Sequence, residues 1–591
     1  MTVVPARRRL AVLQAIALVA FAILVGRLWY LQVLEGPRLA ARSDGNRIRV
    51  RSIVAPRGML YDRHGIPLVD SRPTFRLVVV PRDLTDRREE IARLAVLLRL
   101  PVSELEAPLE EAPVDSPGPV RLRDGLTFDE TSRVEEWRAE LPGVIVEVEP
   151  RRDYPSGPLA AHLLGYVREA GAGQAPQQRY RAGDLAGQSG LERLLDDVLR
   201  GRDGGEEVEV DSSGQAVRVL GRREPRPGAS VITSLDRRIQ AAAERALGEA
   251  PGAVVVMDPR DGDVLAMVSS PTFDLTRFAG PIPRDEWLDL VRHPDHPLLN
   301  RTFQSQYPPG SIFKLVVAAA ALQEGVITPS ETLSCPAAVQ IGNRQFRNWR
   351  HEDQGPMTME RAIATSCNTF FYQLGLEVGA ERIVRHARAF GFGEATGIGL
   401  GGERAGAVPT PEGVDHMIAR RGLPGDTANL SIGQGGVLVT PLQVARFVAA
   451  LANGGILWRP RLIHRIAGDE SAPVLVGPRA AGRVELAPAV LAVLRRSLWA
   501  AVNQGGTASA AAVPGFDVAG KTGTAQIVHD SDAARGQEHA WFAGYAPAGN
   551  PQVVVVVLVE RGGSGGRVAA PIARQIFLEI RRELLAEEHP A

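Results

Sequence analysis

Lysine is almost missing from this sequence, because only Lys314 and Lys521 occur among the 68 lysines and arginines. The other 66 of these residues are arginine. Arginine serves as well as lysine on a solvated surface, but it cannot release its proton near neutral pH, whereas a desolvated lysine can. A solvated surface charge is the competing interpretation of each lysine, yet arginine fills that role everywhere else. We therefore expect both lysines to be functional.

Cysteine is equally scarce, since Cys335 and Cys367 are the only two. They are too few and too far apart for a framework of disulfides or a recognisable zinc pattern, although one bridge between them stays open. An excess of charge is also absent, because 68 acidic residues balance the 68 lysines and arginines. No global field would attract nucleic acid, so a nucleic-acid partner is not expected.

One long apolar run lies near the N-terminus. Positions 10–25 are apolar apart from Gln14, and positions 28–34 extend the run to the length that crosses a bilayer. The arginines at 7–9 favour a cytoplasmic N-terminus, because positive charge is retained on the cytoplasmic side of a span. We therefore expect a single-pass anchor in the cytoplasmic membrane, with the bulk of the chain outside the cytoplasm.

A cleaved signal peptide is the alternative interpretation of this run. The Ala-Phe-Ala sequence at 20–22 resembles a cleavage site, but it lies inside the apolar run rather than after it. Trp29 and Tyr30 would suit the far membrane interface of a retained anchor. The pattern therefore favours a cytoplasmic tail at 1–9 and an uncleaved anchor at 10–34.

The 591 residues are enough for two or three folded units outside the anchor. Up to about position 221 the sequence indicates mixed short strands and helices, such as an apolar strand at 75–80 and a helix at 89–98. The segment 221–230 is rich in Arg, Pro and Gly, which is typical of a connection between domains.

The sequence after this connection indicates strands on both sides of a mainly helical middle. A strand is expected at 231–233, followed by a helix at 239–247 that either Ser234 or Asp236 caps. Apolar segments on both sides of Asp261-Gly262 indicate a hairpin. Further along, the pattern predicts strands at 539–547 and 551–560 and a helix at 570–585. This order of elements predicts an α+β fold.

Lys314 lies at the start of an apolar helix, three residues after Ser311. Pro308, Pro309 and Gly310 form a turn before the helix, so Ser311 lies at the helix N-terminus. The spacing puts Ser311 and Lys314 on one helix face, and the unpaired amides there favour negative charge that develops near the serine. A partly desolvated lysine beside a serine can act as its general base. Ser311 is therefore the candidate nucleophile and Lys314 the candidate base.

Lys521 begins the sequence Lys-Thr-Gly-Thr, on a segment that we expect to be a strand. Gly523 would let a ligand approach the strand backbone. An extended peptide could pair along this edge, and the Lys521 ammonium and the hydroxyls of Thr522 and Thr524 would meet its terminal carboxylate. The pattern therefore predicts a binding site for the end of a peptide.

A third element, Ser366 and Asn368, lies between the two lysines in a helical context. A hydroxyl and an amide two residues apart can pass on a proton and hold a substrate amide. Each of the three motifs is weak alone. Because the chain has only two lysines, and one follows a serine by three while the other opens Lys-Thr-Gly, coincidence is a poor explanation.

The ordered triplet S-x-x-K, S-x-N and K-T-G resembles the signature of penicillin-binding proteins and serine β-lactamases. RGMLYDRHG at 57–65 and GQSGLE at 187–192 are similar to pedestal motifs of class B penicillin-binding proteins, and GFGEATGIGLGGE resembles a transpeptidase stretch. YPPGSIFK, SCNTFFYQLG and IGQG resemble the elongation-type enzyme, penicillin-binding protein 2, more than the division enzyme. The resemblance implies a mixed α/β pedestal (dimerisation-like) domain at 35–225. It also implies a transpeptidase domain at 226–591, an antiparallel sheet with helices on both faces.

The resemblance also implies a peptidoglycan D,D-transpeptidase of a bacterial inner membrane, active in cell elongation. Ser311 would attack the D-Ala-D-Ala end of a stem peptide and pass the acyl group to an amine of a neighbouring peptide. Lys314 would be the base, Ser366 the proton relay and Asn368 a positioner. The donor carboxylate would meet Lys521 and its two threonines, and the oxyanion would lie between the amides of Ser311 and Thr524. β-Lactams would acylate the same serine, and a SEDS-type rod-shape glycosyltransferase would be a membrane partner.

Metal and cofactor sites are not expected. Some elongation-type relatives hold a metal near S-x-N, but this chain has Asn348 and Gln354 where their Asp and His would fall. Cys335, His351 and Asp353 lie nearby in sequence and leave a rebuilt site open, although they follow no ligand pattern. A small buried residue is the favoured interpretation of Cys367.

Other functions remain compatible with the same motifs. A division-type class B enzyme would share them. A β-lactam hydrolase or sensor would need a base for deacylation, and the sequence assigns no such glutamate. A membrane-tethered scaffold, whose main task is to activate a glycosyltransferase, is a further alternative.

Overall fold

The computed structural model describes residues 6–35, 48–110, 119–170, 180, 184–210, 216–280, 282–409, 424–468, 473–527 and 537–588. They form two compact units, each built from several segments of the chain. The first unit comprises Met1–Pro56, Arg72–Arg151 and Gly201–Pro227, and the second comprises Arg57–Ser71, Arg152–Arg200 and Gly228–Ala591. No single cut in the sequence separates the units, so the expected domain boundary between positions 225 and 226 stays a prediction.

The N-terminal element is the long helix α1 (Ala6–Trp29), which continues as the π-helical turn η1 (Tyr30–Leu34). The stretch Leu10–Leu34 has a mean hydropathy of 2.2, and its apolar side chains are exposed. Its 25 residues are long enough and apolar enough to cross a bilayer, as the sequence predicts.

The rest of the first unit is a mixed α/β body with its own core. Its elements are β1 (Ile48–Ile53), the later part of β3 (Pro67–Val79), η2 (Pro81–Asp83), α3 (Arg87–Leu98), α4 (Val102–Glu110), β4 (Val120–Leu126), α5 (Phe128–Glu136), η3 (Arg138–Glu140), β5 (Val144–Asp153), β8 (Gly204–Val210) and β9 (Ala216–Arg223). Strands β1, β8 and β9 form an antiparallel sheet in that order, while β3 pairs with β4 and β5. Leu77, Ile91 and Leu94 pack in the core and have no exposed surface. The strand expected at 75–80 and the helix expected at 89–98 are both present.

The second unit takes in the two pedestal-like motifs. The segments around them form β2 (Leu60–Tyr61), α6 (Ala161–Leu164), β6 (Val167–Glu169), β7 (Leu185–Gly187), α7 (Gly190–Leu194) and α8 (Asp196–Leu199). Arg57 of the first motif pairs with Glu192 of the second at 2.8 Å, and Arg152 pairs with the same carboxylate at 2.6 Å. All three side chains are buried. Because an unpaired buried charge is costly, these ion pairs hold the two motifs together within this unit.

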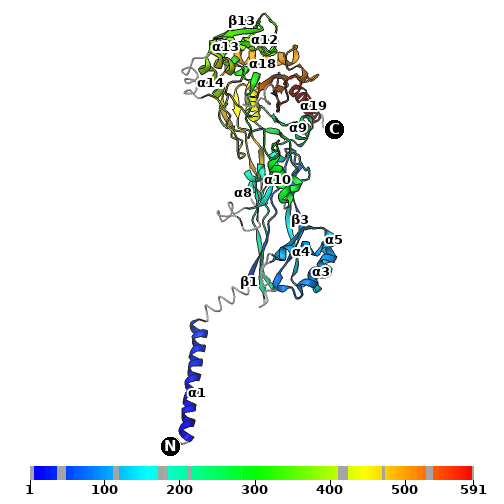
Figure 1. Ribbon diagram of the computed structural model, residues 1–591, viewed down its shortest axis with the longest axis vertical. Helices are drawn as coiled ribbons and strands as arrows, with labels where there is room; N and C mark the ends of the chain where they lie inside the picture. Colours follow the sequence, from blue (N-terminus) through cyan, green and yellow to red (C-terminus); the bar gives the residue numbers. More distant parts are fainter. Residues whose placement is uncertain are drawn as a thin grey trace. The chain divides into compact units, whose positions relative to one another are not determined.

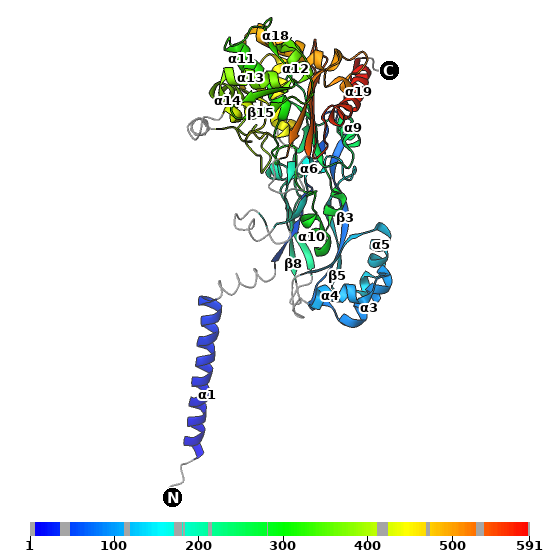
Figure 2. The ribbon, with the colours of Figure 1, turned by 45° about the horizontal axis from the view of Figure 1, so that its top comes forward.

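The centre of the second unit is a five-stranded antiparallel sheet in the order β12, β11, β23, β22, β21. Its strands are β11 (Gly252–Met257), β12 (Val264–Ser270), β21 (Ala519–Gln526), β22 (Glu538–Ala546) and β23 (Val553–Val559). Two terminal helices, α9 (Arg237–Leu247) and α19 (Ala569–Glu588), lie side by side (Figures 1 and 2) and cover one face, and α17 (Pro441–Asn453) covers the other. Side chains alternate between the faces of a strand, so Val254 and Val256 pack under α9 and α19 whereas Val255 packs on the opposite side. Helices on both faces explain why β11 and β23, in the middle of the sheet, are apolar throughout.

The part of the chain between β12 and β21 is mainly helical, and we call its helices the helical lobe. Its elements are η5 (Leu275–Ala279), α10 (Arg284–Arg292), η6 (Gly310–Ile312), α11 (Lys314–Gln323), β13 (Thr332–Ser334), β14 (Ala338–Ile341), β15 (Arg344–Arg347), β16 (Pro356–Thr358), α12 (Met359–Thr365), α13 (Asn368–Val378), α14 (Ala380–Ala389), α16 (Pro424–Ser431), α17, β17 (Ile456–Trp458), β18 (Ile463–Ala467), β19 (Val474–Leu475), β20 (Ala480–Arg483), α18 (Pro488–Asn503) and η7 (Ser509–Ala511). The α+β fold with a helical middle is therefore confirmed.

Several local expectations are resolved by single residues. Of the two possible caps of α9, the structure uses Asp236, whose carboxylate accepts from the amides of Arg238 and Ile239. The hairpin β11–β12 turns at Gly262, which has φ +83°. The linker expected at 221–230 is shorter, because β9 pairs with β8 as far as Arg223 and β10 (Ser230–Thr233) begins at Ser230.

Candidate active site

The turn η6 carries Ser311 into the buried helix α11. Gly310, which opens this turn, has φ +53°, a conformation that glycine adopts without strain. A Cβ at Gly310 would lie 2.8 Å from the carbonyl oxygen of Thr524, and the Gly310 amide donates to the carbonyl of Gly433 at 3.1 Å. The turn therefore presses directly against β21, and Ser311 lies beside the strand that carries Lys521.

Lys314 is fully buried, and its amine is held by the S-x-N segment. Its Nζ donates to the carbonyl oxygen of Ser366 at 2.8 Å and to Asn368 Oδ1 at 2.6 Å, and lies 3.2 Å from Ser366 Oγ. The Phe371 ring, one helical turn beyond Asn368, has its centroid 5.5 Å from Nζ. The structure thus brings together two motifs that are more than 50 residues apart.

The environment of both lysines favours the neutral amine. Burial lowers the pKa of Lys314 well below its ordinary value, and the nearby Lys521 ammonium lowers it further. Lys521 is also fully buried, and desolvation lowers the pKa of its amine to about 7. A general base must have a free lone pair at the working pH, and these surroundings provide amines of that kind.

Ser366 and Asn368 stand at a sharp junction between two helices. Ser366 ends α12 with φ +58°, a left-handed conformation that is uncommon for a residue other than glycine. Cys367 is the N-cap of α13, and its sulfur accepts from the amide of Phe370. Because the chain turns sharply here, three groups reach Lys314: the Ser366 carbonyl, the Ser366 hydroxyl and the side-chain oxygen of Asn368.

Strand β21 is the edge of the central sheet and carries Lys-Thr-Gly-Thr. Lys521 and Gly523 face the helical lobe, and a Cβ at Gly523 would lie 3.3 Å from Ile312 Cγ1. By strand alternation Thr522 and Thr524 point to the opposite face. Lys521 Nζ donates to the Thr522 carbonyl at 2.9 Å. The ammonium and the two hydroxyls therefore do not form one row, and their joint binding of a carboxylate stays a prediction.

Two further residues complete the surroundings of the threonines. Thr507, which follows α18, bonds through its hydroxyl to that of Thr522 at 2.7 Å. The Gly565 amide donates to Thr524 Oγ1 at 3.2 Å, and a Cβ there would lie 2.3 Å from two backbone oxygens. Sequence reasoning missed both residues. Their only local signals were the sequence Gly505-Gly506-Thr507 and the pair Gly565-Gly566, and both patterns are too common to predict a functional site.

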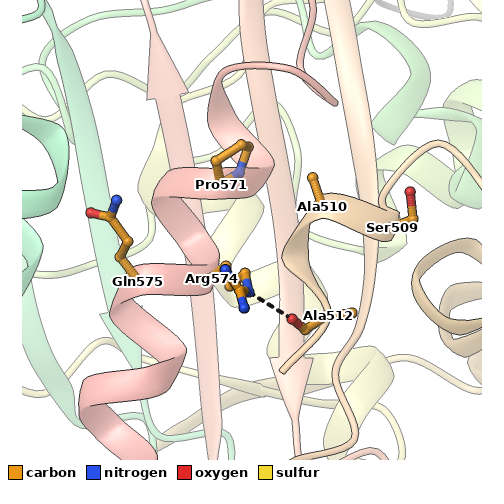
Figure 3. A pocket seen from close by; sticks show the side chains of 6 residues that line it. All are labelled: Ser509, Ala510, Ala512, Pro571, Arg574 and Gln575. Atoms are coloured by element: carbon orange, nitrogen blue, oxygen red, sulfur yellow. Dashed lines mark hydrogen bonds between the residues drawn. The ribbon is translucent and has the colours of Figure 1, made fainter. Parts of the chain in front are cut away.

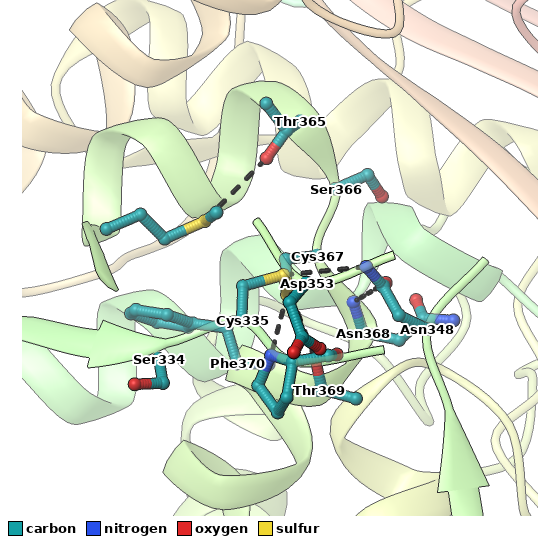
Figure 4. The surroundings of a disulfide bond; sticks show 12 residues. Ser334, Cys335, Asn348, Asp353, Thr365, Ser366, Cys367, Asn368, Thr369 and Phe370 are labelled. Carbon is teal, nitrogen blue, oxygen red and sulfur yellow. Dashed lines mark hydrogen bonds between the residues drawn. A yellow bond between two sulfur atoms is a disulfide. The ribbon is translucent and has the colours of Figure 1, made fainter. Parts of the chain in front are cut away.

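Cys335 and Cys367 form a disulfide beside this site (Figure 4). The bridge that the sequence left open is therefore present, and Cys367 is not a lone buried thiol. Asn348 joins the arrangement, because its Nδ2 donates to Cys335 Sγ at 3.5 Å and its Oδ1 accepts from the Asn368 amide at 2.9 Å. The sequence identified Asn348 only as a departure from a metal-binding pattern, whereas here it fastens S-x-N.

The rebuilt metal site left open by Cys335, His351 and Asp353 finds no support in the described ranges. The sulfur atoms of Cys335 and Cys367 are bonded to each other, and Asp353 Oδ1 accepts from the amide of Ala337 at 2.6 Å. Within 282–409, the range that contains these residues, they do not gather as a set of free ligands.

A surface hollow of about 500 Å³ lies between η7 and α19 (Figure 3). It is lined by Ser509, Ala510, Ala512, Pro571, Arg574 and Gln575. Two of these lining residues are bonded to each other, because Arg574 Nε donates to the Ala512 carbonyl at 3.0 Å. None of the motif residues lines the hollow, so it is not the candidate active site.

Replacing Lys521 by methionine is expected to stabilise the chain at pH 7. Below its unfolded pKa of about 10.5 the lysine is protonated in the unfolded chain, whereas burial lowers its folded pKa to about 7. The wild-type free energy of unfolding should therefore rise between pH 7 and pH 10.5, because the unfolded chain binds more protons there. A shift of one pKa unit corresponds to about 1.4 kcal/mol, so we expect Lys521→Met to gain roughly 1–3 kcal/mol at pH 7.

Calorimetric melting of the full chain in detergent at pH 7 and pH 10 measures this effect. The stability that Lys521→Met gains over the wild type should be smaller at pH 10 than at pH 7. A variant that melts below the wild type at pH 7 would show that Lys521 is held as a well-paired cation instead.

Two known protein domains match this chain. The penicillin-binding protein transpeptidase domain matches residues 252–578, and the penicillin-binding protein dimerisation domain matches residues 52–233. The peptidoglycan D,D-transpeptidase MrdA of Acinetobacter baumannii is 32% identical, over 97% of this chain and 87% of its own length.

Solved structures extend the likeness to the fold. A chain from a study of how a peptidoglycan synthase complex coordinates polymerization and crosslinking is 36% identical, with a TM-score of 0.74 over 97% of this chain and 98% of that one. Penicillin-binding protein 2 of Helicobacter pylori, solved in a complex with MreC, is 25% identical, with a TM-score of 0.77 over 91% of this chain and 99% of that one. With both domain matches and near-full-length relatives in agreement, this chain belongs to the penicillin-binding protein transpeptidase family.

Proposed function

We propose that this chain is an elongation-type peptidoglycan D,D-transpeptidase that works through a Ser311 acyl-enzyme. One observation carries the proposal: the only two lysines of the chain are both buried, and each borders the turn that bears Ser311, with Lys314 in the helix that follows this turn and Lys521 on the strand against which it packs. The near-full-length likeness to MrdA supports the elongation type, and the large pedestal segments distinguish the chain from a small hydrolase.

In the first half of the reaction, Ser311 Oγ attacks the carbonyl carbon of the penultimate D-alanine. Neutral Lys314 takes the hydroxyl proton. A neutral amine has two hydrogens and one lone pair, and the two short contacts of Nζ, to the Ser366 carbonyl and to Asn368 Oδ1, use the two hydrogens. The lone pair is then available to a hydroxyl, which is what a base needs.

Ser366 is placed to carry the proton onward. Its Oγ lies 3.2 Å from Lys314 Nζ, so a proton taken from Ser311 can pass through this hydroxyl to the leaving amine. The carbon–nitrogen bond then breaks, D-alanine leaves, and an ester to Ser311 remains. An acceptor amine attacks this ester, the carbon–oxygen bond breaks, and a proton returns to Ser311 Oγ.

The edge strand β21 offers the donor peptide a backbone to pair with. Thr522 and Thr524 would bind the terminal carboxylate with Lys521 behind them, and Thr507 would orient the Thr522 hydroxyl. The tetrahedral oxyanion would be stabilised by the amides of Ser311 and Thr524, because η6 presses against β21 at this point.

The N-terminal helix would hold the enzyme in the cytoplasmic membrane, with the bulk of the chain after this helix outside the cytoplasm. The related chain in the peptidoglycan synthase complex and the Helicobacter pylori protein bound to MreC suggest the kinds of partner. We propose a SEDS-type glycosyltransferase in the membrane and an MreC-like protein outside it.

Transpeptidation itself is tested with the full chain in detergent, a donor peptide ending in D-Ala-D-Ala, and an acceptor amine. We expect equimolar release of D-alanine and of a cross-linked product, measured by mass spectrometry, and slow turnover of penicillin. Rapid penicillin hydrolysis without cross-linked product would identify a β-lactam hydrolase and refute the proposal.

A further inference from the structure

The middle residue of S-x-N is covalently bound to a residue outside all three motifs. Cys367 is linked to Cys335, which lies 32 residues earlier in the chain. Both cysteines are fully buried. Outside the cytoplasm, where the proposed anchor would place them, such a bond persists.

Hydrogen bonds reinforce this covalent link to the start of α13. Asn348 Oδ1 accepts from the amide of Asn368, and Asn348 Nδ2 donates to Cys335 Sγ. Thr369 donates from its hydroxyl to the Pro336 carbonyl at 2.8 Å. The first turn of α13 is therefore tied to the preceding loop by one covalent and several polar contacts, as Figure 4 shows for Cys335, Asn348 and Asn368.

The residues on either side of Cys367 are the ones that hold Lys314. Ser366 supplies a carbonyl and a hydroxyl, and Asn368 supplies its side-chain oxygen. Ser366 also has φ +58°, a backbone conformation that persists only where the surroundings enforce it. A covalent bond at the next residue provides such enforcement.

We infer that Cys335, Asn348 and Cys367 form a positioning clamp that holds Ser366 and Asn368 on Lys314 and thereby sets the rate at which Ser311 is acylated. The inference rests on the proposed function, since it concerns the same nucleophile. The side chains of all three residues are buried away from solvent, so a direct role in binding substrate is not part of the inference. They act through Ser366 and Asn368, whose displacement by about 1 Å is enough to slow a reaction on the order of 100-fold.

The clamp predicts a change in pH dependence that a merely stabilising bond would not cause. Among the described residues, the groups that contact Lys314 or act on its charge are Lys521 from β21, Ser366 after α12, and Asn368 and Phe371 on α13, and of these only Lys521 is charged. Loosening the S-x-N junction admits water, so the pKa of Lys314 rises toward its ordinary value. The acylation rate, which requires the neutral amine, should then reach its plateau at a higher pH.

The test compares the full-length wild type in detergent with Cys335→Ser/Cys367→Ser and with Asn348→Ala. Acylation by a fluorescent penicillin is followed between pH 5 and pH 10, and folding is checked by circular dichroism and melting. We expect the second-order acylation rate to fall roughly 10- to 100-fold in the double variant and less in Asn348→Ala, with the acid limb moved to higher pH in both.

Ile576→Ala provides the matched control. Ile576 lies on α19 and is buried against the face of the sheet that α9 and α19 cover, so this variant loses stability without touching the site. It should keep the wild-type pH profile. The inference is overturned if folded clamp variants keep the wild-type rate and profile, or if Ile576→Ala shifts the profile equally.

Asn348→Ala keeps the disulfide, so it decides the matter if the double variant does not fold. If penicillin does not label the wild type at all, the proposed function itself is wrong. This outcome differs from a failure of the clamp inference, in which the wild type is labelled and the clamp variants behave like it.

Discussion

Ser311→Ala should abolish covalent labelling by penicillin. The wild type is expected to gain one penicillin mass, because the opened β-lactam remains as an ester on Ser311 Oγ. Alanine removes the only hydroxyl of the turn η6, which lies between the strand of Lys521 and the helix that begins at Lys314. Intact-mass spectrometry of the full chain after exposure to penicillin measures this directly, and the expected loss of adduct is complete.

Ser509→Ala serves as the matched control for this experiment. Ser509 is an exposed serine on η7 that lines the hollow away from the motifs. Its variant should form the full adduct. An adduct that persists on Ser311→Ala would place the nucleophile elsewhere, and peptide mapping would then identify the labelled residue.

Lys314→Arg should slow acylation by roughly 10²–10⁴-fold, the usual contribution of a general base. Arginine retains hydrogen-bond donors for the Ser366 carbonyl and Asn368, but it is permanently charged and has no lone pair to offer near neutral pH. The loss therefore reports the need for a neutral amine with a free lone pair at this position. Stopped-flow measurement of acylation by a chromogenic β-lactam gives the rate.

Lys521→Arg separates the roles of the two lysines. The pKa of Lys521 is lowered to about 7, so its amine could also act as a base. If Lys521 instead serves as a cation for the substrate carboxylate, arginine replaces it with a loss that is much smaller than that of Lys314→Arg. The opposite ranking, with both variants shown by melting to be folded, would make Lys521 the base.

Much of the fold was predictable because its signals are local. The apolar run at 10–34, the hairpin around Gly262 and the valine-rich strand β23 each carry their pattern within a few residues. The sequence left two candidates for the cap of α9, and contacts with distant segments separate them. The Ser234 hydroxyl lies within hydrogen-bond distance of the carbonyls of Val264 and Arg461 instead, whereas the Asp236 carboxylate accepts from the first amides of the helix and also pairs with His64.

The candidate site was predictable to a different extent. The near-absence of lysine singled out Lys314 and Lys521, because a residue that arginine has replaced everywhere else is kept only for a property that arginine lacks. Thr507 and Asn348 carry no such signal. Their importance comes from contacts with residues that are distant in the sequence, at Thr522 and Asn368.

The sequence by itself determined the apolar helix of membrane-spanning length, the strands on both sides of a mainly helical middle, and the residue types of the three motifs. Only the tertiary structure decided that Lys314 meets Ser366 and Asn368, that both lysines are desolvated, and that Cys335 pairs with Cys367. The reason is physical: helix and strand patterns depend on neighbours along the chain, whereas burial, pKa shifts and cross-links depend on segments that folding brings together.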